Sequence, residues 1–162
     1  MKTVYLGLGT NIGNRKENLT RAIEALSLAL GPCTAQSSFI ETAPWGFDSD
    51  NPFLNCAVAF GTELTPHELL DTTEKVEREL GRTTKSSGGV YHDRVIDIDI
   101  LLYGSAIVET PRLTIPHPLM HLRDFVLEPL AEIAPHAIHP KTGKSIEQLK
   151  TELDSSKMVK KD

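Results

Sequence analysis

Apolar side chains form short runs along the first half of the chain, and these runs predict strands. Residues 3–8 and 53–60 have the length and composition of strands buried in a core. Between them, Asn14 with Glu17 three residues later has the form of a capping box and predicts a helix start. Apolar residues then recur at helical spacing from Leu19 to Leu30, ahead of a further strand predicted over 34–41. The first half therefore predicts strand, helix, strand and strand in that order.

The second half continues this order. The motif Thr65-Pro66-His67-Glu68 has the form of a capping box, and it predicts a helix as far as Leu80. An apolar strand over 95–103 and a helix over 119–132 follow, and the tail from 154 to 162 is expected to fray. Strands before and after each helix predict an α+β fold: a ferredoxin-like sandwich in which helices pack on a mainly antiparallel sheet.

Length and charge exclude several classes of protein. A chain of 162 residues fits one domain, which we expect to span residues 1–162. The net charge of −5 argues against non-specific binding of nucleic acid, which needs a basic surface. We expect no membrane span, because no apolar run approaches the ~20 residues that one requires, and we expect no signal peptide. Cys33 and Cys56 lack C-x-x-C spacing, so we expect free thiols in a reducing cytoplasm.

The triplet Asp97-Ile98-Asp99 lies within the predicted strand 95–103 and is the clearest sign of chemistry. Residues two apart in a strand share a face, so both carboxylates point the same way. Two adjacent carboxylates repel each other, and a divalent cation such as Mg²⁺ removes that cost. The alternative is a pair of acids that simply face solvent. The opposite face, expected to point into the core, carries Ile96, Ile98, Ile100 and Leu102.

Basic residues lie in or beside the segments that flank this strand. An acidic protein that keeps cations near an acid pair suits phosphate oxygens, although scattered surface charge is the other interpretation. The cations are Arg82, Lys85, Arg94, Arg112 and Arg123.

Three further motifs are weaker. The glycines between Gly7 and Gly13 resemble a dinucleotide-binding loop, but the third glycine is one place late, so we interpret them as a tight strand-to-helix turn. The segment that ends at Ser145 lacks the first glycine of a P-loop. His117 and His121 have the spacing of zinc ligands on a helix, but Pro118 makes that geometry doubtful.

Several motifs together resemble the 6-hydroxymethyl-7,8-dihydropterin pyrophosphokinase family over about residues 3–150. The most specific stretch is Arg94 to Leu102 with the later Pro116-His117-Pro118. The other motifs are Gly7-Leu8-Gly9-Thr10-Asn11, Thr42-Ala43-Pro44-Trp45-Gly46, Phe53-Leu54-Asn55, the segment from Glu74 to Arg82, and Arg123-Asp124-Phe125.

The resemblance implies an ATP-dependent enzyme of folate biosynthesis that transfers pyrophosphate to the hydroxymethyl group of a reduced pterin and releases AMP. It implies two Mg²⁺ ions held by Asp97 and Asp99, with ATP and the pterin as partners of a cytoplasmic monomer. The residues implied to be catalytic are Asp97, Asp99, Arg94 and Arg82. Those implied to bind ATP are Glu74, Glu77, Lys85, Arg94, Ile100, Thr114, His117 and Arg123. Those implied to bind the pterin are Thr42, Ala43, Pro44, Trp45, Phe53, Asn55 and Phe125.

Two departures from the family and two alternative functions stay open. Thr84 and Lys85 stand where some relatives carry arginines, and Pro118 stands where some carry an aromatic residue. One alternative is another Mg²⁺-dependent transferase that uses the two aspartates, which would not need a pterin-binding set. The other is a ferredoxin-like RNA-binding module, which should show a basic, aromatic sheet face.

Overall fold

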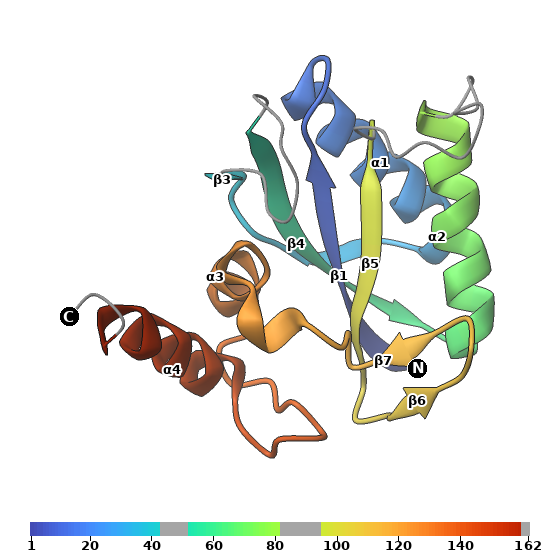
Figure 1. Cartoon of the computed structure of the whole chain (residues 1–162). Coiled ribbons are helices and arrows are strands. Elements are labelled where there is room, and N and C mark those ends of the chain that lie inside the picture. The colour runs from blue at the N-terminus through green and yellow to red at the C-terminus, as the bar shows by residue number, and fades with distance from the viewer. Residues whose placement is uncertain (43–51, 82–94, 160–162) are drawn as a thin grey trace.

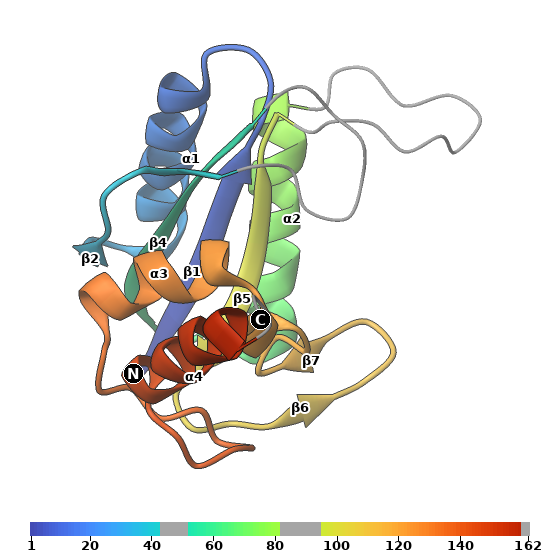
Figure 2. The ribbon, with the colours of Figure 1, turned by 60° about the vertical axis from the view of Figure 1, so that its left-hand side comes forward.

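The computed structural model describes residues 1–42, 52–81 and 95–159. These residues form three layers (Figure 1). Helices α1 (Arg15–Leu30) and α2 (Pro66–Gly81) cover one face of a sheet. Helices α3 (Asp124–Ile133) and α4 (Ile146–Val159) lie on the other face, toward one end of its strands (Figure 2). The α+β prediction is confirmed.

Five antiparallel strands form the sheet. The order β2-β4-β1-β5 is that of a ferredoxin-like fold, and β3 pairs with β4 beyond the end of β2. The strands are β1 (Lys2–Thr10), β2 (Cys33–Gln36), β3 (Ile40–Thr42), β4 (Phe53–Thr62) and β5 (Asp97–Tyr103).

The strand predicted over 34–41 is interrupted. Gln36 lies opposite Val58 and Ile40 opposite Asn55, so the segment between Gln36 and Ile40 has one residue more than the facing part of β4. Ser37 bridges the break: its backbone N–H donates to the carbonyl of Ala57, and its Oγ accepts from the N–H of Ala57, both at 2.9 Å. The side chain thus replaces a backbone partner where the ladder stops.

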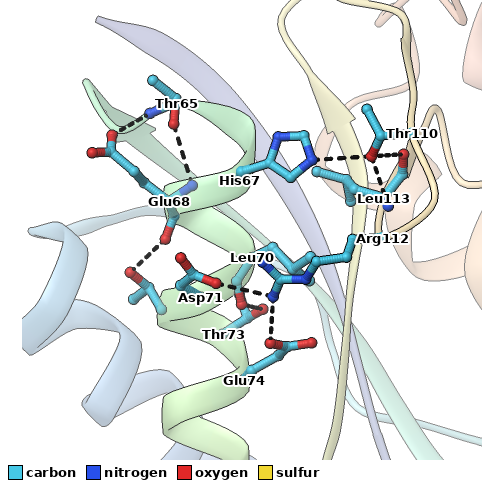
Figure 3. Close-up of polar contacts among 11 residues, drawn as sticks. Thr65, His67, Glu68, Leu70, Asp71, Thr73, Glu74, Thr110, Arg112 and Leu113 are labelled. Atoms are coloured by element: carbon cyan, nitrogen blue, oxygen red, sulfur yellow. Dashed lines mark hydrogen bonds and ion pairs between the residues drawn. The ribbon is translucent and has the colours of Figure 1, made fainter.

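Both predicted helix starts are confirmed. Asn14 caps α1, since its side chain accepts a hydrogen bond from the N–H of Glu17 at 3.1 Å. At α2 the box is reciprocal (Figure 3): the N–H of Thr65 donates to Glu68 Oε1 at 2.9 Å, and the N–H of Glu68 donates to Thr65 Oγ1 at 3.2 Å. α1 ends at Gly31, whose φ of 106° favours glycine.

The region after β5 agrees with the sequence prediction only in part. The sequence predicts a short extended piece near 106–108, and this piece overlaps β6 (Val108–Glu109), which forms a hairpin with the unpredicted β7 (Thr114–Ile115). The helix predicted over 119–132 is divided into a short 3-10 helix, η2 (Met120–Leu122), and α3, because Arg123 between them has extended backbone angles.

Residues 154–159, where the sequence predicts a frayed tail, continue α4 as far as Val159. Leu149 and Leu153 of this helix pack against the apolar cluster under α3. Lys157 forms an ion pair with Asp124, so the last turns are also fixed to the start of α3. Residues 160–162 lie outside the described part of the chain.

Two apolar clusters fill the space on either side of the sheet. The first joins α1 and α2 to the sheet and includes the buried Leu6, Leu26 and Phe60. The second joins α3 and α4 to the opposite face and includes Leu127 and Leu130.

Leu102 lies in the second cluster, not in the first as alternation predicts. Tyr5 pairs with Leu102 and Leu6 with Ile100, so Leu101 is an extra residue, a β-bulge that shifts the side-chain alternation of β5 by one place. Across the described segments, every helix is too short or too polar to cross a membrane.

Candidate functional site

A cavity of about 180 Å³ opens on the sheet face that α3 and α4 leave partly uncovered. It lies where β1, β4 and β5 run side by side, next to the start of α3. Its lining combines glycines, two carboxylates, an arginine, polar side chains and aromatic rings. The lining residues are Gly7, Leu8, Gly9, Thr42, Phe53, Asn55, Cys56, Ala57, Asp97, Asp99, Leu101, Arg123, Phe125, Val126 and Pro129.

Gly9 creates the centre of this cavity. It lies in β1 between Asn55 of β4 and Asp97 of β5. A Cβ atom at Gly9 would lie 2.8 Å from Asn55 Oδ1, which is closer than real Cβ contacts allow. Gly7 has the same role toward Leu101, whose Cδ1 would lie 3.3 Å from an added Cβ. Gly7 lies in the strand predicted over 3–8, whereas Gly9, which we interpreted as part of the turn, is also a strand residue, because β1 extends to Thr10.

Asp97 and Asp99 share the cavity face of β5, as their spacing predicts. They lie opposite Gly9 and Gly7, so no side chain of β1 comes between them and the cavity. Glu77 of α2 reaches the strand from the other face, where its Oε2 accepts a hydrogen bond of 2.7 Å from the N–H of Ile98. This contact fixes the backbone between the two aspartates.

His117 reaches the acidic end of the cavity from the segment after β7. Its backbone N–H donates to the carbonyl of Leu101 at 3.1 Å, and its ring Nε2 lies 4.0 Å from Asp99 Oδ1. Burial lowers the pKa of His117 below its usual 6.5, and nearby Arg123 lowers that pKa further, whereas Asp97 acts in the opposite direction. The N–H of Leu119 donates to Nδ1 at 3.4 Å. The neutral ring therefore carries its proton on Nε2, the atom facing Asp99.

The opposite end of the cavity is polar and aromatic. Asn55 Nδ2 donates a hydrogen bond of 2.8 Å to Thr42 Oγ1, which joins β4 to β3. Thr42 lies directly opposite Phe53 in the ladder. Phe125 lies at the start of α3, and the guanidinium carbon of Arg123 lies 5.5 Å from the centre of its ring. The cavity thus has a charged end and a flat aromatic end.

Comparison with known proteins gives concordant results. A family model described as 7,8-dihydro-6-hydroxymethylpterin-pyrophosphokinase (HPPK) matches residues 5–135. A relative from Porphyromonas gingivalis, named 2-amino-4-hydroxy-6-hydroxymethyldihydropteridine pyrophosphokinase, is 52% identical over 141 residues, 86% of this chain and 95% of the relative. A relative of the same name from Aquifex aeolicus is 43% identical over 152 residues, 94% of this chain and 92% of the relative.

The chain belongs to the HPPK family. The sequence prediction of a pyrophosphokinase of folate biosynthesis is therefore confirmed. Solved structures agree on the fold. One described as HPPK-DHPS in complex with substrates gives a TM-score of 0.73 at 16% identity, over 96% of this chain and 44% of that chain. HPPK-DHPS from Plasmodium falciparum with pteroate gives 0.74 at 16% identity, over 93% of this chain and 42% of that chain.

Most of the described residues that the HPPK resemblance assigns to the site lie in or beside the cavity. Thr42, Phe53 and Asn55 line it from β3 and β4, and Asp97 and Asp99 line it from β5 on the other side of β1. Arg123 and Phe125 lie against each other at the start of α3 and also line it. His117 and Glu77 contact β5 from either side, as described above. The fold thus brings together side chains from six separate segments of the chain.

Other predicted residues lie away from the cavity. Glu74 and Asp71 of α2 bind Arg112 of the β6–β7 turn, with N–O distances of 2.9 and 3.0 Å (Figure 3). Arg112 is thus engaged by these acids, outside the cavity lining. The side chain of Ile100 is buried in the first cluster, and Thr114 lies in β7, opposite Glu109.

The remaining predictions fall on positions outside the described residues. They are Ala43, Pro44, Trp45, Arg82, Lys85 and Arg94. The structure also adds lining residues that sequence reasoning missed, namely Ala57, Val126 and Pro129. Their apolar side chains carry no chemical signal, and only the strand register and the placement of α3 bring them to the cavity.

The donor atoms of Asp97 and Asp99 fit magnesium, the ion that this HPPK resemblance implies. Mg²⁺ prefers carboxylate oxygens and is usually held by one or two of them, with water and substrate phosphates completing its shell. Within residues 1–42, 52–81 and 95–159, no group of three histidine, cysteine or acidic side chains could hold a metal alone. Two carboxylates on an open cavity suit an ion shared with a phosphate ligand.

Proposed function

We propose that this chain transfers the pyrophosphoryl group of ATP to the hydroxymethyl group of 6-hydroxymethyl-7,8-dihydropterin, with release of AMP. Membership of the HPPK family supports this reaction. The observation that carries it is the composition of a single cavity. A pair of carboxylates at one end and an aromatic, amide-lined pocket at the other suit a phosphate chain and a flat heterocycle side by side.

The aromatic end suits the pterin. A fused ring is bound by flat apolar walls and a few fixed polar groups, which Phe53, Phe125 and Asn55 supply. Thr42 accepts the amide N–H of Asn55 at 2.8 Å, so the amide is held in one orientation. We therefore assign Thr42, Phe53, Asn55 and Phe125 to pterin binding.

The charged end suits the triphosphate. We assign Asp97 and Asp99 to two Mg²⁺ ions, and bound magnesium supplies positive charge that neutralises phosphate oxygens. Arg123 adds a permanent positive charge to the same end. His117, neutral with its proton on Nε2, can donate a hydrogen bond to a phosphate oxygen.

The proposed reaction joins the hydroxymethyl oxygen to the β-phosphorus and breaks the bond from that phosphorus to the oxygen bridging the α-phosphorus. Such a transfer depends mainly on alignment and charge, because the protein forms no covalent intermediate. The role of the protein is to hold the hydroxyl of a pterin between Phe53 and Phe125 against a triphosphate held at Asp97 and Asp99.

The experiment uses ATP labelled separately at the β and γ positions. Incubation with Mg²⁺ and the reduced pterin should put both labels in the pterin product and form AMP in equal amount. Release of ADP, or a product that carries only the γ label, would contradict pyrophosphoryl transfer while leaving the metal site in place. A matched incubation without the pterin shows whether water replaces it as acceptor.

Several details stay predictions. They include contacts of ATP with Glu74, Glu77, Ile100 and Thr114, a monomeric state, the exclusion of nucleic acid as a partner, and a cytoplasmic location. The location is expected because Cys33 and Cys56 are both free thiols.

A further inference from the structure

Arg15 makes contacts that its place at the start of α1 does not explain. Its Nη1 donates to the carbonyl of Pro52 at 2.9 Å, and its Nη2 lies 2.7 Å from Glu41 Oε2. A positive charge in the first turn of a helix opposes the helix dipole. The favourable interactions of this guanidinium therefore lie outside α1, at the adjoining ends of β3 and β4.

Both partners of Arg15 adjoin residues assigned to the pterin. Glu41 precedes Thr42, the last residue of β3, and Pro52 precedes Phe53, the first residue of β4. Thr42 and Phe53 lie directly opposite each other in the ladder.

Arg15 contacts these strands on the face of the sheet opposite to the cavity. Successive strand residues point to opposite faces, so Glu41 faces away from the side that Thr42 faces. Glu41 lies opposite Leu54, whose side chain packs against the cluster under α1. A side chain on that face has no direct path to a ligand between the rings of Phe53 and Phe125.

We propose that Arg15 is a positioning residue for the pterin pocket, which sets the separation of Thr42 and Phe53 without touching the substrate. The inference rests on the proposed function, because the pterin is its ligand. A planar guanidinium can bind two acceptors in different directions, whereas an ammonium group is a single point charge. The Arg15 side chain is 29% exposed and the Glu41 side chain 55%, so the guanidinium is partly shielded from water while the carboxylate is largely in contact with it. Any shift of Thr42 also reaches Asn55 through their hydrogen bond.

The test measures pterin and ATP affinity separately in Arg15→Ala. Calorimetry with 6-hydroxymethyl-7,8-dihydropterin, Mg²⁺ and α,β-methylene-ATP should show pterin binding weakened about tenfold, with nucleotide binding changed less than about twofold. Arg15→Lys should give an intermediate value, because it keeps the charge but loses one contact. The matched control is Arg21→Ala, which removes a 62% exposed arginine of α1 paired only with Glu17 in the described structure, and both affinities should stay unchanged.

Glu41→Gln tests the same contact while leaving α1 intact, so it decides the matter if Arg15→Ala does not fold. It should weaken pterin binding less than Arg15→Ala does. The double variant should bind no more weakly than Arg15→Ala alone, since both changes remove one interaction.

Unchanged pterin affinity in Arg15→Ala and Glu41→Gln, or equal losses for pterin and nucleotide, would overturn the positioning role. Wild-type protein that binds no pterin would overturn the proposed function and this inference together. The wild-type titration therefore distinguishes the two failures.

Discussion

Asp97 and Asp99 are the residues on which the proposed chemistry depends most directly. Replacing either with asparagine should leave the fold intact, because the substitution is nearly isosteric and relieves repulsion between the two carboxylates. Turnover should fall by at least about 100-fold, since metal stabilisation of phosphoryl charge supplies several kcal/mol. AMP formation under saturating substrates measures the loss, and circular dichroism checks the fold.

The control for this change is Asp71→Asn, which removes a carboxylate that binds Arg112 outside the cavity. Its turnover should match that of the wild type. Near-normal turnover in both cavity variants would contradict the magnesium assignment.

Phe125 tests the aromatic end of the cavity. Truncation in Phe125→Ala removes one proposed wall of the pterin and the ring beside Arg123. The Kd of the pterin should rise by about tenfold or more, because aromatic contact and buried area together contribute on the order of 1–3 kcal/mol, while the Kd of ATP changes less. Calorimetry with each substrate measures both.

Phe39 provides the comparison, since it packs against the first cluster and does not line the cavity. Phe39→Ala should lower the melting temperature without separating the two affinities. A Phe125→Ala variant that behaves in the same way would mean that Phe125 is only a core residue.

At the scale of elements, the turn between α3 and α4 predicts how stability depends on pH. His139 is buried there, and burial lowers the pKa of its ring below 6.5; nearby His121 and Lys141 lower it further, against a smaller raising effect of its own backbone. The unfolded chain then binds a proton more readily than the folded chain as pH falls below about 6.5. Stability is therefore retained above 6.5 and lost as the pH falls toward the lower, folded-state pKa.

Urea unfolding at several pH values between about 7.5 and 5 measures this slope. In His139→Gln the dependence of stability on pH should become shallower. The lowered pKa of His117 accounts for part of the dependence that is left. The exposed His136 provides the control, and His136→Gln should keep the wild-type slope. A slope that does not change in His139→Gln would contradict the assignment.

Elements governed by local chemistry could be predicted from sequence. The caps at Asn14 and Thr65 depend on residues three positions apart, and the helices begin where those residues indicate. The extent of α4 depends instead on contacts distant in sequence, such as Lys157 with Asp124, which no local pattern contains. The bulge at Leu101 could not be predicted either, because Leu101 and Leu102 are both leucines and the sequence does not indicate which face of the sheet each one occupies.

The candidate site divides in the same way. The spacing of Asp97 and Asp99 within an apolar strand was enough to predict a shared face and an oxygen-rich metal site. Thr42, Asn55 and Phe125 give no such signal on their own, and only resemblance to a family pointed to them. What brings them together is the register of β3, β4 and α3, which depends on the whole sheet.

At the scale of the whole molecule, one sheet separates two apolar clusters, and we expect them to unfold together. Leu26→Ala in the first cluster and Leu127→Ala in the second each remove a fully buried side chain. Each should lower the free energy of unfolding by about 2–5 kcal/mol. Since β1, β4 and β5 contribute to both clusters, each variant should show a single transition.

Calorimetry checks this through the ratio of the calorimetric to the van't Hoff enthalpy, which should stay near unity. Leu28→Ala is the matched control, because Leu28 lies on the same helix as Leu26 and is 90% exposed. Its melting temperature should equal that of the wild type. A separate early transition in Leu127→Ala would show that the second cluster unfolds on its own.

The extra residue at Leu101 divides β5 into two stretches whose side chains on the α3–α4 side of the sheet contact different parts of the molecule. Before it, Asp97 and Asp99 line the cavity that we assign to the substrates. After it, the side-chain alternation of β5 is shifted by one place, and Leu102 packs in the second cluster with α3 and α4. Removal of Leu101 would restore regular alternation, with Ile100 facing the first cluster, Leu102 the second and Tyr103 the first. The strand would then be one residue shorter, and Leu102 would stay in its layer.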